Sequence, residues 1–470
     1  MTRDRGAPLR GAPLRLIYVV PFFPYPPANG GSIRVWHTLR GLAVRNDVHL
    51  VVQAERPPHE HVAPVQALAR SLTFAPPHEG PHPDRHIAAP RLATAVDALQ
   101  YPPAWLQRYR SRELTERVGA LIATHGADWL LCDTQLSGQL ALSPRLPMVR
   151  RALCLYDLYD VYFQAKAAAT PWRPYKLKVT LDWFKARHYE RRIMRRFDLV
   201  SVVSARERRL ALPHVRPMTP VVLVPSGVDT DYFQPPSRGY DAARDPTNAA
   251  DSAPAAGPAR GPDADTTARL LFVGALGYEP NDDALRYFLE RIWPLVRARV
   301  PGARFDVVGK GPSAWLRTAV ARDDTVALYG GVEDVRPYYR RARVAVAPLR
   351  LGAGTKLKVL EALAMGVPLV TTPQGRRGLA IHDGRHALVG ATPERFATCI
   401  AAILDDRALA ARLSAAGRSL VEREYSWPRI MATFEETLRR NVAAHGAATT
   451  VATEGGRMTR GRAEHDDGLG

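Results

Sequence analysis

The sequence contains little cysteine and no long uninterrupted run of apolar residues. Its three cysteines, Cys132, Cys154 and Cys399, are too few and too widely spaced for a disulfide framework or a thiolate metal site. No stretch approaches the roughly 18–20 apolar residues that a membrane-spanning helix needs. Residues 1–14 are basic but also lack the apolar core and small-residue cleavage site of a secretory signal. We therefore expect a protein of the reducing cytoplasm.

Acidic residues are scarce relative to basic ones. The 470 residues include 65 Lys+Arg and 46 Asp+Glu, a formal net charge of +19, which favours an anionic partner. Residues 166–209, the basic segment, hold thirteen Lys/Arg and four Asp/Glu, an excess of nine positive charges. Aromatic residues are interleaved with these cations: Trp172, Tyr175, Trp183, Phe184 and Tyr189.

Three interpretations of the basic segment stay open. It is a solvated helix whose aromatic side chains pack inward, a helix on an anionic membrane surface, or a nucleic-acid-binding segment. Nucleic acid is the least favoured, because no recognised binding motif accompanies the charge. We expect no nucleic-acid partner, and we leave peripheral association with the inner face of the cell membrane open beside a cytoplasmic location.

The length and the pattern of apolar residues predict two α/β domains. A single hydrophobic core rarely grows beyond about 250–300 residues. Short apolar runs alternate with helical patterns, which predicts two Rossmann-like parallel sheets. The predicted strands are 16–20, 48–52, 129–132, 152–156, 199–203 and 221–224, then 270–273, 305–308, 344–347 and 369–372. Ser32 is placed to cap the helix after the first strand.

Changes in composition predict the domain boundaries. Residues 234–267 are rich in Pro, Ala, Asp and Gly and contain almost no large apolar side chain. Such a stretch cannot offset the entropy of ordering, so we expect a disordered linker or insertion. The linker separates an N-terminal domain (14–233) from a C-terminal domain (268–423), and flexible tails are expected at 1–13 and 443–470.

The segment most informative about chemistry is 347–368. A predicted strand is followed by a glycine-rich turn that opens a helix ending at Gly366. The turn thus lies at the carboxyl end of a parallel strand, where N–H groups at the helix start favour phosphate. Lys356 and Lys358 occupy the first turn, where a cation costs about 0.3–1 kcal/mol unless an anion is bound.

This arrangement indicates a bound diphosphate. Glu361, one turn further along the helix, is placed to accept hydrogen bonds from ribose hydroxyls. The alternative is a solvated helix start whose lysines face water, since glycine turns before helices are common in α/β proteins.

Seven blocks resemble, in order, the retaining glycosyltransferases of the two-domain GT-B type often called family 4. Together they span most of the chain outside the tails and linker, and their order makes the resemblance specific. The blocks are Asn29-Gly30-Gly31; 224–229 with Phe233; Phe272-Val273-Gly274 with 280–282; 308–312; 330–332; Glu361-Ala362 with Gly366 and Pro368; and Tyr425-Ser426-Trp427.

The resemblance implies a GT-B fold in which two domains face a cleft. It makes 14–233 the acceptor domain and 268–423 the nucleotide-sugar domain, and it makes 424–442 a helix that crosses back to the first domain. It also implies transfer of a sugar from a nucleotide-diphosphate sugar to a lipid-linked, polysaccharide or other glycan acceptor, with retention. No cofactor is expected, because the nucleotide-sugar donor is itself a substrate. No metal is expected either, because basic side chains and backbone N–H groups of residues 350–358 would perform the task that a metal performs elsewhere.

The resemblance also assigns site residues. Ala353 stands where the family often has its first glutamate and Ala275 where it has an arginine, so Arg350, Lys356 and Lys358 would neutralise the diphosphate. The family's histidine is replaced in the stretch 155–160, where Tyr156, Asp157 or Asp160 would face the reacting sugar. The catalytic candidates are Asp157, Asp160, Arg350 and Lys356, and the donor-binding candidates are Gly30, Gly31, Gly274, Gly354, Thr355, Leu357, Lys358 and Glu361.

Two metal-like patterns are interpreted otherwise. Asp229-Thr230-Asp231 has the spacing of a metal-binding DxD, but we expect a turn. His59 and His61, with three later histidines up to residue 86, lie among prolines without helical spacing, which favours a solvated loop over zinc.

Two other functions stay open. One is a nucleotide-sugar epimerase on the same fold, and the other is a non-catalytic membrane- or nucleic-acid-binding scaffold.

Overall fold

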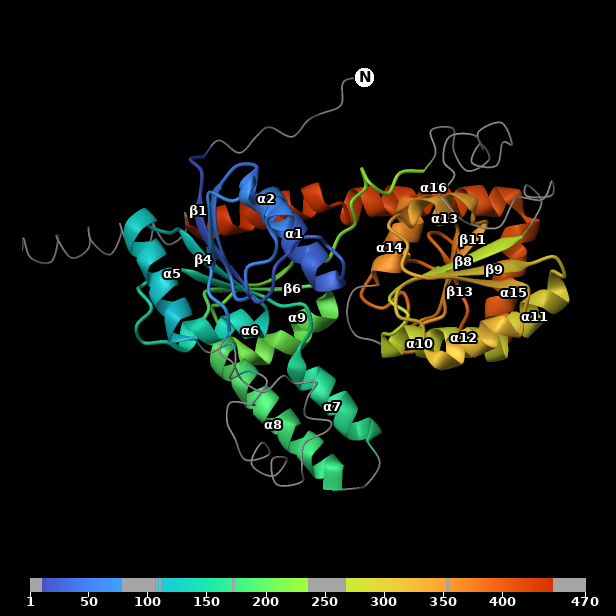
Figure 1. Ribbon diagram of the computed structural model, residues 1–470, viewed down its shortest axis with the longest axis horizontal. Helices are drawn as coiled ribbons and strands as arrows, with labels where there is room; N and C mark the ends of the chain where they lie inside the picture. Colours follow the sequence, from blue (N-terminus) through green and yellow to red (C-terminus); the bar gives the residue numbers. More distant parts are fainter. Residues whose placement is uncertain are drawn as a thin grey trace, which may run out of the picture. The chain divides into compact units, whose positions relative to one another are not determined.

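The computed structural model describes residues 11–77, 106, 109, 111–170, 174–235, 268–351 and 356–442. They form two compact units (Figure 1). The first takes the described residues of Met1–Val202 and Met431–Gly470, with Glu207–Val224; the second takes Val203–Arg206 and the described residues of Pro225–Ile430. The expected linker from residue 236 on, the tail from 443 and the glycine-rich turn 352–355 lie outside the described residues.

The first unit is built on a seven-stranded parallel sheet with the order β3-β2-β1-β4-β5-β6-β7. Its central strands are buried on both faces, as the apolar runs predicted. The strands are β1 (Arg15–Val20), β2 (Asp47–Val52), β3 (Ser71–Phe74), β4 (Trp129–Asp133), β5 (Arg151–Cys154), β6 (Leu199–Val202) and β7 (Val221–Leu223).

The helix after β1 is capped differently from our expectation. Asn29, not Ser32, is the N-cap: its Oδ1 accepts from the Ser32 backbone N at 3.0 Å, while the Asn29 backbone N donates to Ser32 Oγ at 3.0 Å. This reciprocal capping box satisfies two backbone donors at once. The helices of this unit are α1 (Gly30–Ala43), α2 (His59–Gln66), α5 (Arg112–His125), α6 (Thr134–Gly138), α7 (Tyr159–Ala169), α8 (Pro174–Met194) and α9 (Ala205–Ala211), with the 3-10 turns η2 (Gln139–Leu142) and η3 (Leu212–His214).

The basic segment includes the last residues of α7, all of α8 and the start of α9. Helices α7 and α8 pack against each other and extend from the sheet of the first unit (Figure 1). Tyr189 is buried, whereas Tyr175 and Phe184 are more than half exposed, at 53% and 55%. The aromatic side chains are thus divided between core and surface. Within the part of the chain that the structure describes, no helix is both long and apolar enough to cross a membrane.

The second unit contains a six-stranded parallel sheet with the order β10-β9-β8-β11-β12-β13. An aromatic cluster of Phe288, Trp293, Phe305 and Phe396 packs beside it. The strands are β8 (Arg269–Val273), β9 (Arg304–Val308), β10 (Val326–Tyr329), β11 (Val344–Ala347), β12 (Leu369–Thr371) and β13 (Leu388–Val389). The helices are α10 (Glu279–Tyr287), α11 (Trp293–Arg299), α12 (Ala314–Ala321), α13 (Arg336–Arg341), α14 (Leu357–Ala364), α15 (Pro393–Asp405) and α16 (Arg407–Glu424), with the π-helical turn η6 (Phe288–Ile292) between α10 and α11.

A last helix, residues 427–442, completes the first unit from Met431 onward. The indole Nε1 of Trp129 donates to the Leu438 carbonyl at 3.2 Å, and Arg439 donates to Oδ1 of Asn46 at 2.8 Å. A Cβ atom on Gly41 would lie 2.5 Å from Met431 Cγ, so the glycine permits close packing of this helix on α1.

Candidate functional site

The strand order of the second sheet reverses between β8 and β11, the position at which open α/β sheets bind ligands. Gly274 directly follows β8, and α14 follows β11. A Cβ atom on Gly274 would lie 3.0 Å from Asn281 Nδ2 and 3.1 Å from Lys358 Cε. The structure therefore brings together Gly274, Lys358 and Asn281, of which the first two are predicted donor-binding residues.

The ammonium of Lys358 lies among groups that do not fully neutralise it. Nζ donates to Asn281 Oδ1 at 2.7 Å and lies 5.2 Å from the centroid of the Phe272 ring. Burial lowers the Lys358 pKa to about 8, although the Glu361 carboxylate acts in the opposite direction. A cation held in this way gains free energy when an anion binds beside it.

Asn281 fixes that ammonium to the loop after β8. Its Nδ2 donates to the carbonyl of Ala275 at 2.8 Å, while its Oδ1 accepts from Lys358. The amide orientation follows from this pair of bonds.

Glu361 faces the same cluster from the next turn of α14. Tyr339 OH, on the buried face of α13, donates to Glu361 Oε2 at 3.2 Å. Burial raises the pKa of Glu361, against the influence of Tyr339 and Lys358. The carboxylate is therefore held in place by a hydrogen bond.

Two other predicted residues begin α14. Lys356 is buried at the N-cap position, and Leu357 is the first helical residue. The remaining two donor-binding candidates of this turn, Gly354 and Thr355, lie outside the described residues.

Arg350 has other partners. Its Nε donates to Asp283 Oδ2 at 3.1 Å, and its guanidinium lies 4.6 Å from the centroid of the Tyr287 ring. Both partners are on α10. A role for Arg350 at the diphosphate, which stays a prediction, therefore requires it to leave or share this half-exposed ion pair.

The first sheet reverses its order between β1 and β4, and polar groups meet there as well. Gly30 and Gly31 begin α1, and a Cβ atom on Gly31 would lie 2.8 Å from Phe22 Cζ. Glycine at this position therefore lets the loop after β1 pack tightly against the helix start.

A buried carboxylate that the sequence did not indicate lies at this reversal. Asp133 ends β4, and its Oδ1 accepts hydrogen bonds from Tyr18 OH at 2.9 Å and from Tyr156 OH. Its Oδ2 has no hydrogen-bond partner among the described residues. Burial raises the Asp133 pKa to about 6, although the two tyrosine hydrogen bonds and Arg34 act in the opposite direction.

The backbone next to this carboxylate is unusual. Thr134 has φ of 61°, the only positive φ of a non-glycine residue in the described part of the chain. Strained residues of this kind gather at functional sites. The guanidinium of Arg34 lies 4.9 Å from the centroid of the Tyr156 ring, so a cation also belongs to the cluster around Asp133.

The two aspartates predicted to face the sugar have structural contacts. The Asp157 carbonyl accepts from Gln135 Nε2 at 2.6 Å. Asp160 accepts from Trp183 Nε1 at 2.5 Å, and its Oδ2 lies 3.6 Å from His214 Nε2. Asp160 is thus held between α8 and η3.

Glu190 accepts hydrogen bonds from the backbone at the start of α7. Its buried carboxylate accepts from the backbone N of Tyr159 at 2.6 Å and of Asp160 at 3.0 Å, at the start of α7. Burial raises its pKa to about 7, against hydrogen bonds from Gln135 and these amides.

The DxD-like segment is a turn, as expected. Asp229 Oδ1 accepts from the backbone N of Asp231 at 3.1 Å and of Tyr232 at 2.9 Å. Over the residues that the structure describes, which include His59 and His61, no three His, Cys, Asp or Glu side chains are grouped so that they could hold a metal ion.

Comparisons with known proteins identify a related family and related folds. Residues 267–406 match the family of glycosyl transferases group 1. The GDP-mannose-dependent alpha-(1-6)-phosphatidylinositol monomannoside mannosyltransferase of Mycobacterium tuberculosis is 30% identical over 281 residues, which cover 55% of this chain and 66% of the relative. The protein of the same name from Mycolicibacterium smegmatis is 25% identical over 373 residues, which cover 72% of this chain and 88% of the relative.

Among solved structures, sucrose-phosphate synthase from Thermosynechococcus elongatus aligns with a TM-score of 0.61 and 19% identity, over 92% of this chain and all of the other. The chain spans just under two thirds of the length of the Mycobacterium tuberculosis relative, at 66%. The fold of two parallel-sheet units is that of the GT-B glycosyltransferases. The second unit contains the stretch that matches the glycosyl transferases group 1 family.

Proposed function

We propose that the protein transfers a hexose from a nucleotide-diphosphate sugar to a lipid-linked glycan acceptor. The observation that carries the proposal is the position of Lys358. Its ammonium lies at the start of α14, at the reversal of the second sheet, with the neutral Asn281 as its hydrogen-bond partner. A negatively charged diphosphate is the ligand that this position favours.

In the proposed reaction, the bond between sugar and diphosphate breaks and negative charge grows on the leaving group. Preorganised donors that face this charge are usually the largest catalytic contribution. Lys356, Lys358 and the first amides of α14 supply such donors, and Arg350 adds to them if it leaves Asp283. We propose that they make a metal ion unnecessary, so that activity persists in a chelator, and that the anomeric configuration is retained.

The remaining predicted residues take roles around the donor. Gly274 lets the donor approach the loop after β8, and Glu361 accepts from the ribose hydroxyls. On the first unit, Gly30 and Gly31 approach the donor through backbone groups. The sugar or acceptor meets Tyr156 and its partner Asp133, or one of Asp157 and Asp160.

The relatives guide the choice of donor. Those reported above are named for GDP-mannose as donor and a phosphatidylinositol monomannoside as acceptor. We therefore propose GDP-mannose as the first donor to test and a glycolipid as the acceptor class.

We also propose that the first unit works at an anionic membrane surface. Tyr162, Tyr175, Leu177 and Phe184 on α7 and α8 are 53–66% exposed, among the cations of the basic segment. Exposed aromatics beside cations are typical of interfacial helices. A lipid-linked acceptor would be reached in this way without a membrane-spanning helix.

The test is a thermal-shift series with GDP, UDP, GDP-mannose and UDP-glucose, followed by a transfer assay with product analysis. A ligand that binds the folded state raises the melting temperature according to RT ln(1 + [L]/Kd). Stabilisation by one nucleotide and formation of a glycosidic bond support the proposal. Conversion of the donor sugar without transfer would identify an epimerase instead, and the absence of any nucleotide effect would favour a scaffold.

A further inference from the structure

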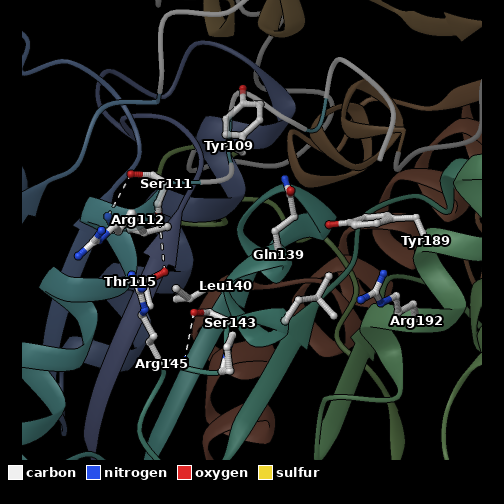
Figure 2. Close-up of a pocket in the computed structure, with 13 residues that line it drawn as sticks. Tyr109, Ser111, Arg112, Thr115, Gln139, Leu140, Ser143, Arg145, Tyr189 and Arg192 are labelled. Atoms are coloured by element: carbon white, nitrogen blue, oxygen red, sulfur yellow. Dashed lines mark hydrogen bonds between the residues drawn. The ribbon is translucent and has the colours of Figure 1, made fainter. Parts of the chain in front are cut away.

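A cavity in the first unit has none of the predicted donor-binding residues in its described lining. It has a volume of about 500 Å³ and is lined by residues of α5, of α8 and of the segment from η2 to Arg145 (Figure 2). This volume lies within the range of small-molecule sites. Its described lining residues all belong to the first unit, whereas the cluster around Lys358 belongs to the second.

The charged side chains in the described lining are all positive. Arg112, Arg145 and Arg192 contribute to it, and among the described lining residues there is no Asp or Glu. Figure 2 shows Arg112 and Arg145 on one side of the hollow and Arg192 on the other. Such an arrangement favours an anion between guanidinium groups, which bind phosphate oxygens in a bidentate way.

Two of these guanidinium groups have no partner in the described part of the chain. Arg112 donates to Glu116 at 2.7 Å, whereas for Arg145 the only hydrogen bond is the one from its backbone N to Ser143 Oγ, and for Arg192 there is none. Their positive charge is therefore available to a ligand at no cost of breaking an ion pair.

The rest of the lining suits an organic ester rather than a bare ion. Ser143 and Thr115 provide hydroxyls, while Leu114, Leu140 and Leu142 provide apolar surface. Polar donors placed around a partly apolar wall are the usual composition of a ligand site.

The floor of the cavity is connected to the loop at the carboxyl end of β5. Tyr189 lines the cavity, and its OH donates to the carbonyl of Gln135 at 2.7 Å. Gln135 Nε2 in turn donates to the carbonyl of Asp157 at 2.6 Å. Two hydrogen bonds thus join the cavity to the loop that is predicted to face the sugar.

We propose that this cavity binds the phosphate ester of the acceptor, through Arg145 and Arg192, and so selects acceptors that carry a phosphate group. The identification of the ligand as the acceptor rests on the proposed transfer, whereas binding of a phosphate ester to the cavity is measured without any donor.

The test uses the full chain and two variants at exposed positions, Arg145→Gln and Arg192→Gln, singly and together, with Arg412→Gln on α16 as the matched control. Binding of glycerol 3-phosphate, inorganic phosphate and glycerol is measured by titration calorimetry at low salt. We expect glycerol 3-phosphate to bind more tightly than inorganic phosphate, and glycerol not to bind. Because each arginine supplies a charge-assisted hydrogen bond to the phosphate, each substitution should weaken binding of glycerol 3-phosphate by about tenfold. The control should have no effect.

Equal affinity for glycerol 3-phosphate and inorganic phosphate, or unchanged affinity in the double variant, would overturn the inference. A melting temperature and circular dichroism spectrum equal to those of the wild type verify that each variant is folded. In the transfer assay, the double variant should raise KM for a phosphate-bearing acceptor with kcat unchanged. An unaltered KM refutes the acceptor role and leaves the proposed transfer intact, whereas failure of the wild-type protein to transfer any sugar refutes the proposed function.

Discussion

Lys358 Nζ donates a 2.7 Å hydrogen bond to Asn281 Oδ1, although 77 positions separate the two residues in the chain. The bond joins α14 to α10 at the point where the order of the second sheet reverses. It holds the Lys358 side chain close to Gly274, where a Cβ atom on residue 274 would lie only 3.1 Å from Lys358 Cε. A cation that is kept in place by a neutral amide is free to exchange part of that contact for a diphosphate.

Replacing Lys358 by methionine should reduce transfer strongly and leave the fold intact. A charge-assisted hydrogen bond is worth about 1.5–3 kcal/mol, so we expect kcat/KM to fall roughly tenfold to a hundredfold. Lys356→Met should have an effect in the same range, and Arg412→Met on α16 serves as the control. Steady-state kinetics with GDP-mannose measure the decrease, and wild-type turnover in both lysine variants would remove the diphosphate from this site.

Affinity for GDP should decline as the pH rises above about 8. The Lys358 pKa of about 8 in the free protein must rise when a diphosphate binds, so above pH 8 binding takes up a proton and becomes weaker. In Lys358→Met this part of the pH dependence should disappear. Titrations between about pH 7 and 9 compare the two proteins, and parallel profiles would argue against contact between Lys358 and the diphosphate.

Gly309→Ala should destabilise the second unit severely. Gly309 has φ of 156°, and a Cβ atom there would lie 1.7 Å from the carbonyl oxygen of Gly274. Because the loops after β8 and β9 meet at these two glycines, we expect a decrease of about 2–4 kcal/mol in the free energy of unfolding. Gly302→Ala is the matched control, since nothing lies within 4 Å of its Cβ position. Chemical denaturation measures both, and a similar cost in the two variants would contradict the contact.

Asp133 should make stability depend on pH below neutrality. Its folded-state pKa, about 6, is raised by burial from 3.8, so the folded protein holds the proton more tightly than the unfolded chain. Stability that is present near pH 4 is therefore lost as the pH rises through 6, by roughly 1–3 kcal/mol. The difference between wild type and Asp133→Asn should follow this curve in denaturant titrations. A difference that is constant from about pH 4 to 7 would mean that the carboxyl does not titrate in this window.

Vesicle binding tests the membrane surface proposed for α7 and α8. Co-sedimentation with acidic vesicles should weaken with salt, at about 1 kcal/mol per engaged Lys or Arg. The double variant Leu177→Ser, Phe184→Ser should bind less, because both side chains are exposed on α8, at 66% and 55%. Met148→Ser with Met218→Ser, exposed elsewhere on the first unit, is the control. Equal binding to neutral vesicles would exclude the electrostatic part of this proposal.

The sequence was sufficient to predict most of the sheet because buried parallel strands are apolar throughout. The predicted strand 16–20, for example, coincides with β1 to within one residue. The missed strands lie at the edges of the sheets. Ser71–Phe74 (β3) and Val326–Tyr329 (β10) are only partly buried, and Leu388–Val389 (β13) has only two residues. Such short segments give no periodic signal that can be distinguished from a loop.

The candidate site was predictable only where it depends on local order. Lys358, Glu361 and Gly274 stand in motifs with fixed spacing, and the structure places Lys358 beside Gly274. Asp133 and Tyr339 contribute through tertiary contacts that no local pattern records. Ser32 was assigned as the N-cap because serine is common at that position. In the structure Asn29 is the N-cap, and Ser32 is the N3 residue of the capping box.

The helix 427–442 has a consequence for how the protein is made. The first unit cannot bury Trp129 and Gly41 fully until Met431 and Leu438 have been synthesised, since these lie against them. The core of the first unit therefore stays incomplete on the ribosome until the second unit has been synthesised. The described residues of that second unit end at Ile430. Premature termination directly after Ile430 would release a chain with an unfinished amino-terminal core, and expressing residues 14–233 alone would produce the same defect.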